Sequence, residues 1–138
     1  MSIDSLIARL YQAYNAHDTA AVAALYAAEA THEDIAQGKP KRGPDEIAAG
    51  LGRFVGWFPD ARWTPQHHAI GGAGVAAVSY LLTATLKGQF GPIAPRDQAI
   101  SLRGVHMLQV RDGLIRRSED YWDAATFQRQ LNPVKERS

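Results

Sequence analysis

Residues 99–123, AISLRGVHMLQVRDGLIRRSEDYWD, decide how this chain folds. Two runs rich in aliphatic residues flank Arg111-Asp112-Gly113, and an Asp-Gly pair between such runs strongly indicates a β-hairpin. His106 lies in the first run, among apolar residues of the same parity, and Asp120 lies near the end of the second. The geometry of the turn determines whether these two side chains share one face of the sheet.

Two turns fit this hairpin. A two-residue turn at Asp112-Gly113 would place Glu119 opposite His106 and send Asp120 to the other face, because neighbours along a strand alternate. A three-residue loop with Gly113 in a bulge would place Ser118 opposite His106. Asp120 would then lie diagonally from His106 on the same face, with Cβ atoms about 7 Å apart. We predict the three-residue loop, because it brings an imidazole and a carboxylate together on the apolar face.

Composition indicates one domain over residues 1–138, with a core at about 3–131 and a flexible tail at 132–138. Hydrophobic residues make up 46% of the chain, as in compact globular proteins. The net charge of +1, without a basic block before the last residues, argues against nucleic acid or a membrane surface as partner. The absence of cysteine excludes disulfides and thiolate chemistry. Without an apolar run of membrane-spanning length or a signal-peptide pattern, we expect a cytoplasmic protein.

The first part of the chain reads as helical. Ser2 can cap a helix in which apolar residues recur at helical spacing from Ile3 to Tyr14. Asp18 can cap a second, alanine-rich helix that extends to about Glu29. A third helix is expected to begin at 43–45, with proline in its first turn, and to end at Pro59.

Strands dominate the second part. A short polar strand at 30–36, which places His32 and Asp34 on one face, and a loop at 37–42 precede the third helix. Four strands then follow as successive hairpins, and a closing helix covers 124–131. The glycine- and proline-containing connection at 87–98 is a candidate lid. This order indicates an α+β fold with three helices packed on one curved, mainly antiparallel sheet. The four predicted strands are 62–70, 75–86, 99–110 and 114–123.

The candidate polar residues also have ordinary structural explanations. His106 could be a hydrogen-bonded core histidine and Asp120 a solvated carboxylate at the end of a strand. His32, Asp34, His106 and Asp120 could together ligate a divalent ion, but they lack the compact spacing of a metal motif. The neighbours His67 and His68 should point to opposite faces of a strand and cannot share a metal. We therefore predict no metal site.

Three stretches carry a family resemblance: NAHD from Asn15, GQFGPIAPRDQAISLRGVHML from Gly88, and VRDGLIRRSEDYWDAATFQRQL from Val110. Together with the order of the elements they resemble the SnoaL-like polyketide cyclases of the nuclear transport factor 2-like superfamily. The resemblance implies a cone-shaped α+β barrel and a homodimer or homotetramer, with the open face of the sheet as its interface.

In the cyclases of that family, an aspartate on the last strand acts as acid and base, helped by a histidine on the preceding strand. Asp120 and His106 match these two positions. Asp34 falls where the related ketosteroid isomerases carry their general base, but Leu10 and His106 replace the isomerase oxyanion residues. In limonene-type epoxide hydrolases an Arg-x-Asp pair occurs where this chain has Tyr80 and Leu82. The resemblance therefore favours neither of these two reactions.

These observations together predict an enzyme that needs no cofactor and binds a small hydrophobic or aromatic carbonyl compound. Burial of Asp120 would raise its pKa toward neutrality, as general acid–base catalysis requires. The expected reaction is deprotonation beside a carbonyl, followed by intramolecular aldol closure. Alternatives are an isomerase or dehydratase that uses Asp34, a cofactor-free monooxygenase, and a non-catalytic binding or dimerisation module. Further polar contacts are expected from Asp34, His32 and Tyr14, and pocket walls from Trp57, Phe58, Tyr80, Leu82, Leu102 and Trp122.

Overall fold

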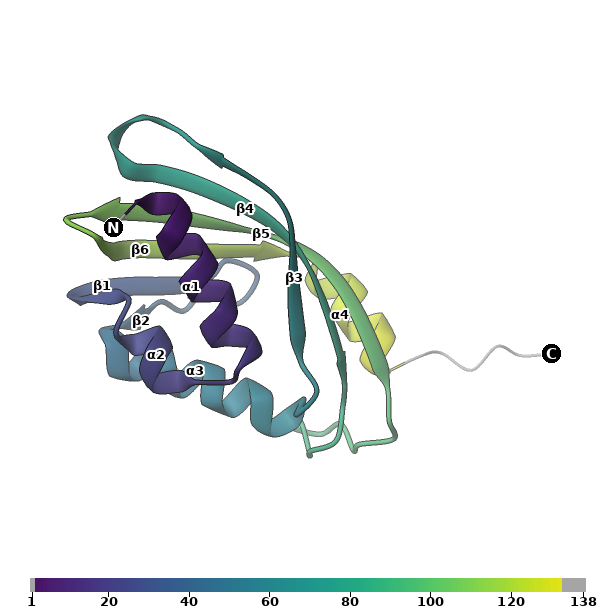
Figure 1. The fold of residues 1–138 in the computed structure, drawn as a ribbon. Helices are drawn as coiled ribbons and strands as arrows, with labels where there is room; N and C mark the ends of the chain where they lie inside the picture. The colour runs from purple at the N-terminus through teal and green to yellow at the C-terminus, as the bar shows by residue number, and fades with distance from the viewer. Residues whose placement is uncertain (1, 133–138) are drawn as a thin grey trace.

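A computed structural model of the chain describes residues 2–132 and shows an α+β fold (Figure 1). Three helices and two strands make up the first part of the chain, and four successive strands and a last helix follow. The helices are α1 (Ile3–Asn15), α2 (Thr19–Ala23), α3 (Pro44–Trp57) and α4 (Ala124–Leu131), with a short 3₁₀ turn at Gly72–Gly74. The strands are β1 (Tyr26–Asp34), β2 (Lys41–Arg42), β3 (Arg62–Ile70), β4 (Val75–Thr85), β5 (Ala99–Arg111) and β6 (Leu114–Trp122).

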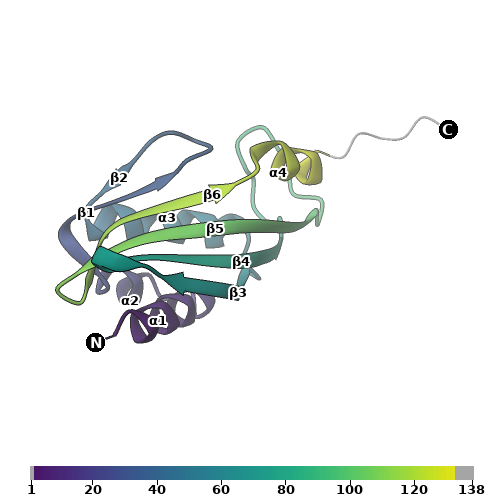
Figure 2. The ribbon, with the colours of Figure 1, turned by 90° about the horizontal axis from the view of Figure 1, so that it is seen from above.

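The strands form one six-stranded sheet in the order β2-β1-β6-β5-β4-β3. Only β1 and β6 run parallel, and every other neighbouring pair is antiparallel. The sheet is strongly curved and does not close into a barrel. Helices α1, α2 and α3 lie on its concave side, and α4 lies at the far end of β6 (Figures 1 and 2). This arrangement confirms the predicted fold class and leaves the convex face of the sheet uncovered by any described helix.

The NAHD motif fixes the junction of α1 and α2 against the start of β3. The Asn15 side chain donates to the carbonyl oxygen of Trp63 and accepts from its backbone nitrogen, both at 2.8 Å. His17, whose φ of 55° ends α1, lies 2.8 Å from the carbonyl oxygen of Ala61 through Nε2. Asp18 then caps α2. The motif therefore joins the helical layer to the edge of the sheet.

The decisive hairpin has a different turn from the one predicted. Asp112 and Gly113 both have positive φ, and Arg111 pairs with Leu114, so the turn has two residues. A register shift between Gln109 and Val110 leaves Arg116 as an extra residue in β6, which restores the parity. Consequently His106 and Asp120 do share the concave face, as direct partners in the register and not as diagonal neighbours.

The segment after α2 also differs from its prediction. The helix ends at Ala23, and residues from Tyr26 onward join β1 beside β6, although alanine favours helix. Strand pairing thus outweighs local propensity at 26–29. The predicted loop at 37–42 contains the short strand β2. The helix at 124–131 and the four long strands are confirmed to within one or two residues. Of the predicted tail at 132–138, residues 133–138 lie outside the described residues.

The core lies between the concave face of the sheet and the helices. It contains alternate side chains of β4 and β5, such as Val78, Leu82 and Leu108, together with Leu6 and Leu10 of α1. Alternation leaves the other side chains of these strands on the convex face. Within residues 2–132, no helix is long and apolar enough to cross a membrane.

Candidate active site

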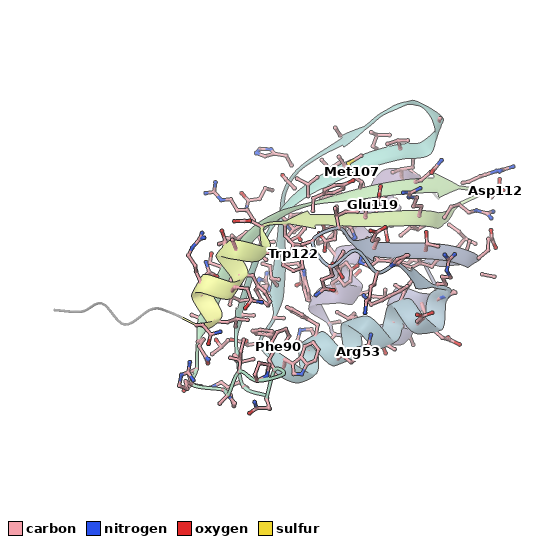
Figure 3. The ribbon with its side chains drawn as sticks, turned by 180° about the vertical axis from the view of Figure 1, so that it is seen from behind. Arg53, Phe90, Met107, Asp112, Glu119 and Trp122 are labelled. Carbon is pink, nitrogen blue, oxygen red and sulfur yellow. The ribbon has the colours of Figure 1, made fainter. Side chains whose placement is uncertain are left out.

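A cavity of about 240 Å³ lies between the concave face of the sheet, α3 and the Lys87–Gln98 connection. Its walls combine aromatic and aliphatic side chains with several polar groups. Arg53 on α3, Phe90 on the connection and Trp122 at the end of β6, all labelled in Figure 3, are among its lining residues. The aromatic walls are Tyr14, Phe54, Trp57, Trp63, Tyr80, Phe90, Trp122 and Phe127, and the polar side chains include His32, Asp34, Gln37, Lys41, Arg53, His106 and Asp120.

Asp120 is the acidic group with the most unusual environment. It projects from β6 into the cavity, and the hydroxyl of Tyr80 donates to its Oδ1 at 2.6 Å. Burial raises the pKa of Asp120 to about 7, and the nearby charge of Asp34 acts in the same direction. The hydrogen bond from Tyr80 favours the ionised form and opposes this rise. Asp120 therefore titrates near neutrality, in the range that a general acid and base requires.

Asp34 faces the same cavity but has the opposite electrostatic character. Burial alone would raise its pKa, but His32, the ammonium of Lys41 and the indole of Trp122 more than offset this effect and lower it. Lys41 Nζ lies 3.4 Å from Oδ2, and Trp122 Nε1 donates to Oδ1 at 3.2 Å. Asp34 is therefore ionised at neutral pH, whereas Asp120 exchanges its proton there. The cavity holds two carboxyl groups with clearly separated pKa values.

Buried hydrogen bonds hold His32 in place. Ser118 Oγ lies 2.7 Å from His32 Nδ1 and 2.7 Å from the hydroxyl of Tyr26. On the other side of the imidazole, His32 Nε2 lies 3.7 Å from Asp34 Oδ1. Ser118 is 1% exposed and does not line the cavity. This serine–histidine–aspartate line therefore orients His32 and does not present a nucleophile.

His106 is more deeply buried than His32. Tyr14 stacks on its ring, and the hydroxyl of Tyr11 lies 3.5 Å from Nδ1. Burial lowers the pKa of His106 to about 3, and the neighbouring His32 contributes to this shift, so the imidazole is neutral. Among residues 2–132, Nε2 has no hydrogen-bond partner. Although His106 pairs with Asp120 in the sheet register, Tyr80 is the residue that bonds the carboxyl group.

Most of the residues predicted for the pocket line the cavity. Phe58 is the exception: it is completely buried and stacks on Phe54, which takes the position at the cavity wall. The predicted wall residues that do line it are Trp57, Tyr80, Leu82, Leu102 and Trp122, and the predicted polar residues are Tyr14, His32, Asp34, His106 and Asp120.

Sequence reasoning missed Lys41 and Trp63 at the cavity and Ser118 beneath it. Lys41 fell in a segment that we expected to be loop, so its side chain had no predicted direction. Ser118 could have been found, because it has the same strand parity as Asp120.

Three side chains meet the distance requirement for a metal site. Donor atoms of His32, Asp34 and Asp120 lie within 4.8 Å of one another. The Lys41 ammonium already neutralises Asp34 there, and Trp122 holds its other oxygen. A cation at this position would have to displace Lys41.

The curved sheet with helices on its concave side and a cavity between them defines the class of ketosteroid isomerase-like, or nuclear transport factor 2-like, folds. A protein of this fold from Catenulispora acidiphila, solved with trimethylamine, aligns with a TM-score of 0.81 at 18% identity, over 94% of each chain. A protein from Xanthomonas campestris, provisionally named a polyketide cyclase, aligns with a TM-score of 0.86 at 21% identity, over 94% of this chain and 96% of the other. IdmH of Streptomyces antibioticus, which has the same provisional name, aligns with a TM-score of 0.80 at 24% identity, over 93% of this chain and 96% of the other.

Residues 7–118 match the family described as the SnoaL-like domain, and the chain belongs to this family. The matched segment contains His106 and ends two residues before Asp120. No protein of curated function matches the sequence. Family membership and the similar structures establish the fold, and the function is argued from the site.

Proposed function

We propose that this protein is a cofactor-independent acid–base enzyme, of the polyketide cyclase type, that acts on a small aromatic carbonyl compound. The observation that carries this proposal is Asp120, a carboxyl group with a pKa of about 7 inside an aromatic cavity. A group with this pKa is present in both protonation states at neutral pH. It can therefore take a proton and return it within one catalytic cycle.

In the proposed reaction, ionised Asp120 removes a proton from the carbon beside a carbonyl group. The electron pair of the broken C–H bond forms an enolate, whose carbon attacks a second carbonyl of the same molecule. A new C–C bond forms, and Asp120 returns its proton to the resulting alkoxide. Two donors at the cavity can stabilise the enolate oxygen: His32 Nε2 and Lys41 Nζ. His106 contributes a neutral imidazole to the same wall, with Nε2 buried and Tyr11 able to donate to Nδ1.

The size of the cavity favours a compact ligand. Its volume of about 240 Å³ is below the range of about 300–1,000 Å³ that is usual for sites of drug-sized molecules. Flat walls such as Trp57 and Trp63 suit an aromatic ring, and the polar side chains suit its carbonyl groups. We therefore propose substrates with one or two fused rings.

Proton exchange tests this function without knowledge of the natural substrate. Aromatic β-dicarbonyl compounds with one or two rings are incubated with the protein in deuterium oxide, and deuterium incorporation is followed by NMR. We expect exchange above the buffer rate, and Asp120→Asn to reduce the excess by about 10²–10⁴-fold. Asp112→Asn, at the exposed hairpin tip, is the matched control and should leave it unchanged. Equal exchange by Asp120→Asn and the unchanged protein would refute the role of Asp120.

Binding is measured separately from the chemistry. All three tryptophans of the chain, Trp57, Trp63 and Trp122, line the cavity, so a bound aromatic compound should change the intrinsic fluorescence. Asp120→Asn should keep this response while losing exchange. A fluorescence response without deuterium exchange, in the unchanged protein as well as in Asp120→Asn, would instead favour a non-catalytic binding module.

A second candidate function uses Asp34 as the base, in an isomerase or dehydratase. The observation that favours it is the ionised state of Asp34, which lines the same cavity within 4.8 Å of Asp120. Loss of exchange in Asp34→Asn with full exchange in Asp120→Asn would identify this alternative. Oxygen consumption with the same compounds would instead indicate a cofactor-free monooxygenase.

We also propose that the protein is a homodimer or homotetramer that associates through the convex face of the sheet. Val105 and Tyr121 are paired across β5 and β6 on this face, and they are 38% and 43% exposed. Met107 and Glu119, labelled in Figure 3, are the next pair on the same face. Large apolar side chains grouped on an uncovered sheet face are typical of a contact surface.

A further inference from the structure

Tyr80 reaches Asp120 from a strand that is not its neighbour. Tyr80 lies on β4 and Asp120 on β6, with β5 between them (Figure 2). The residue of β5 that pairs with Tyr80 is Gly104. A Cβ atom built at Gly104 would overlap the ring and the hydroxyl oxygen of Tyr80. The Tyr80 ring therefore lies over the backbone of β5 in the space that any other residue would fill.

This crossing delivers a hydrogen-bond donor to one oxygen of Asp120. The Tyr80 hydroxyl lies 2.6 Å from Oδ1, and no residue among 2–132 donates a hydrogen bond to Oδ2. Burial and the charge of Asp120 raise the pKa of Tyr80 far above its ordinary value, so the phenol keeps its proton and acts only as a donor. The two oxygens of Asp120 are thereby distinguished: Oδ1 is held, and Oδ2 is open.

We propose that Tyr80 is a positioning residue that holds Oδ1 of Asp120 and leaves Oδ2 as the oxygen that exchanges a proton with the substrate, with Gly104 as the opening that allows this contact. The catalytic use of this Tyr80–Asp120 contact rests on the function proposed above. The contact itself and its effect on Asp120 do not depend on any substrate.

The proposal differs from a purely structural role for Tyr80 in its effect on the titration of Asp120. A donor to the carboxylate favours the ionised form, so its removal should raise the pKa of Asp120 further. Hydrogen bonds to charged groups are strong enough for a shift of about one to two pH units. A tyrosine that merely fills space would leave the titration unchanged when only its hydroxyl is removed.

The test is an NMR titration of the protein labelled with ¹³C at the aspartate carboxyl carbon. The signal of Asp120 is identified by its disappearance in Asp120→Asn. We expect a midpoint near 7 in the unchanged protein and a rise of about one to two pH units in Tyr80→Phe, which keeps the ring. Tyr121→Phe is the matched control, because Tyr121 lies on β6 but on the convex face and is 43% exposed. Its midpoint should equal that of the unchanged protein.

Gly104→Ala tests the opening separately, because it retains the hydroxyl but displaces the ring. Its midpoint should rise in the same direction as that of Tyr80→Phe. An unchanged midpoint in Tyr80→Phe would overturn the role of Tyr80, whether or not Gly104→Ala folds. A shift in Tyr80→Phe with none in folded Gly104→Ala would overturn the role of Gly104. Failure of the exchange experiment with a shifted midpoint would refute the proposed reaction and leave this contact standing.

Discussion

A half-buried carboxyl group beside aromatic rings, as in Asp120, binds a proton more tightly in the folded protein than in the unfolded chain. Its folded pKa is about 7, against an ordinary value of 3.8. Between these two values the folded state holds more protons, so stability falls as the pH rises from about 4 to about 7. Above pH 7 Asp120 is ionised in both states, and its unfavourable contribution to the free energy of unfolding no longer changes with pH.

We therefore predict that Asp120→Asn is more stable than the unchanged protein at pH 8, by about 2–4 kcal/mol. The difference should shrink toward pH 4, where Asp120 is neutral in both states. Urea unfolding at pH 4.5 and pH 8 measures both values. Asp112→Asn, whose carboxyl group is exposed at the hairpin tip, is the control for removal of a carboxylate outside the cavity. A variant that is less stable at pH 8 would contradict the burial of an ionised carboxyl group.

At this scale the sequence analysis placed Asp120 and His106 on one face, but through a three-residue loop that the structure does not have. The extra residue Arg116, which the sequence did not reveal, restores the parity instead. The sequence could not place Tyr80 on Asp120, since that contact depends on the register of three strands and on the missing side chain of Gly104. The ion pair between Lys41 and Asp34 could not be predicted from the sequence either. The lysine crosses Gly50 of α3, where a Cβ atom would come within 2.6 Å of its Cε.

At the scale of elements, the last hairpin shows which features a sequence can hide. The Asp-Gly turn was recognisable, but the extra residue at Arg116 was not. Arg116 forms ion pairs with Glu29 of β1 and, at 3.6 Å, with Asp112, so its position depends on a strand far away in the sequence. The irregular register of β1 between Tyr26 and Thr31 lies opposite this bulge. Neither irregularity can be predicted without the other.

The β3–β4 connection meets this hairpin at Gly74. Gly74 has a φ of +75°, and a Cβ atom there would overlap the carbonyl oxygen of Val110. We predict that Gly74→Ala lowers the free energy of unfolding by about 2–5 kcal/mol, from backbone strain together with steric overlap. Gly91 is the matched control: its φ is +57°, and no atom lies within 4 Å of a Cβ built there. Gly91→Ala should lower stability by about 1–2 kcal/mol, as urea unfolding would show. Equal losses would contradict the close approach at Val110.

At the scale of the whole molecule, the proposed association through the convex face gives a direct prediction. Val105→Glu places a charge at the centre of the exposed apolar pair and should convert the oligomer to a monomer. Sedimentation at micromolar concentration measures the change. Asp112→Glu, at the hairpin tip, should leave the mass unchanged. A monomer before any substitution would contradict the proposal.

The overall architecture followed from the sequence because long alternating strands and capped helices specify it locally. The pairing of β1 with β6 could not be predicted from the sequence, because no turn connects a strand to a parallel neighbour far along the chain.

One consequence concerns the tryptophan near the start of β3. Asn15 holds the backbone of Trp63 through two hydrogen bonds of 2.8 Å, and Trp63 lines the cavity. The NAHD motif, remote from the reacting groups, would in this way set the placement of one aromatic wall against which a substrate ring lies.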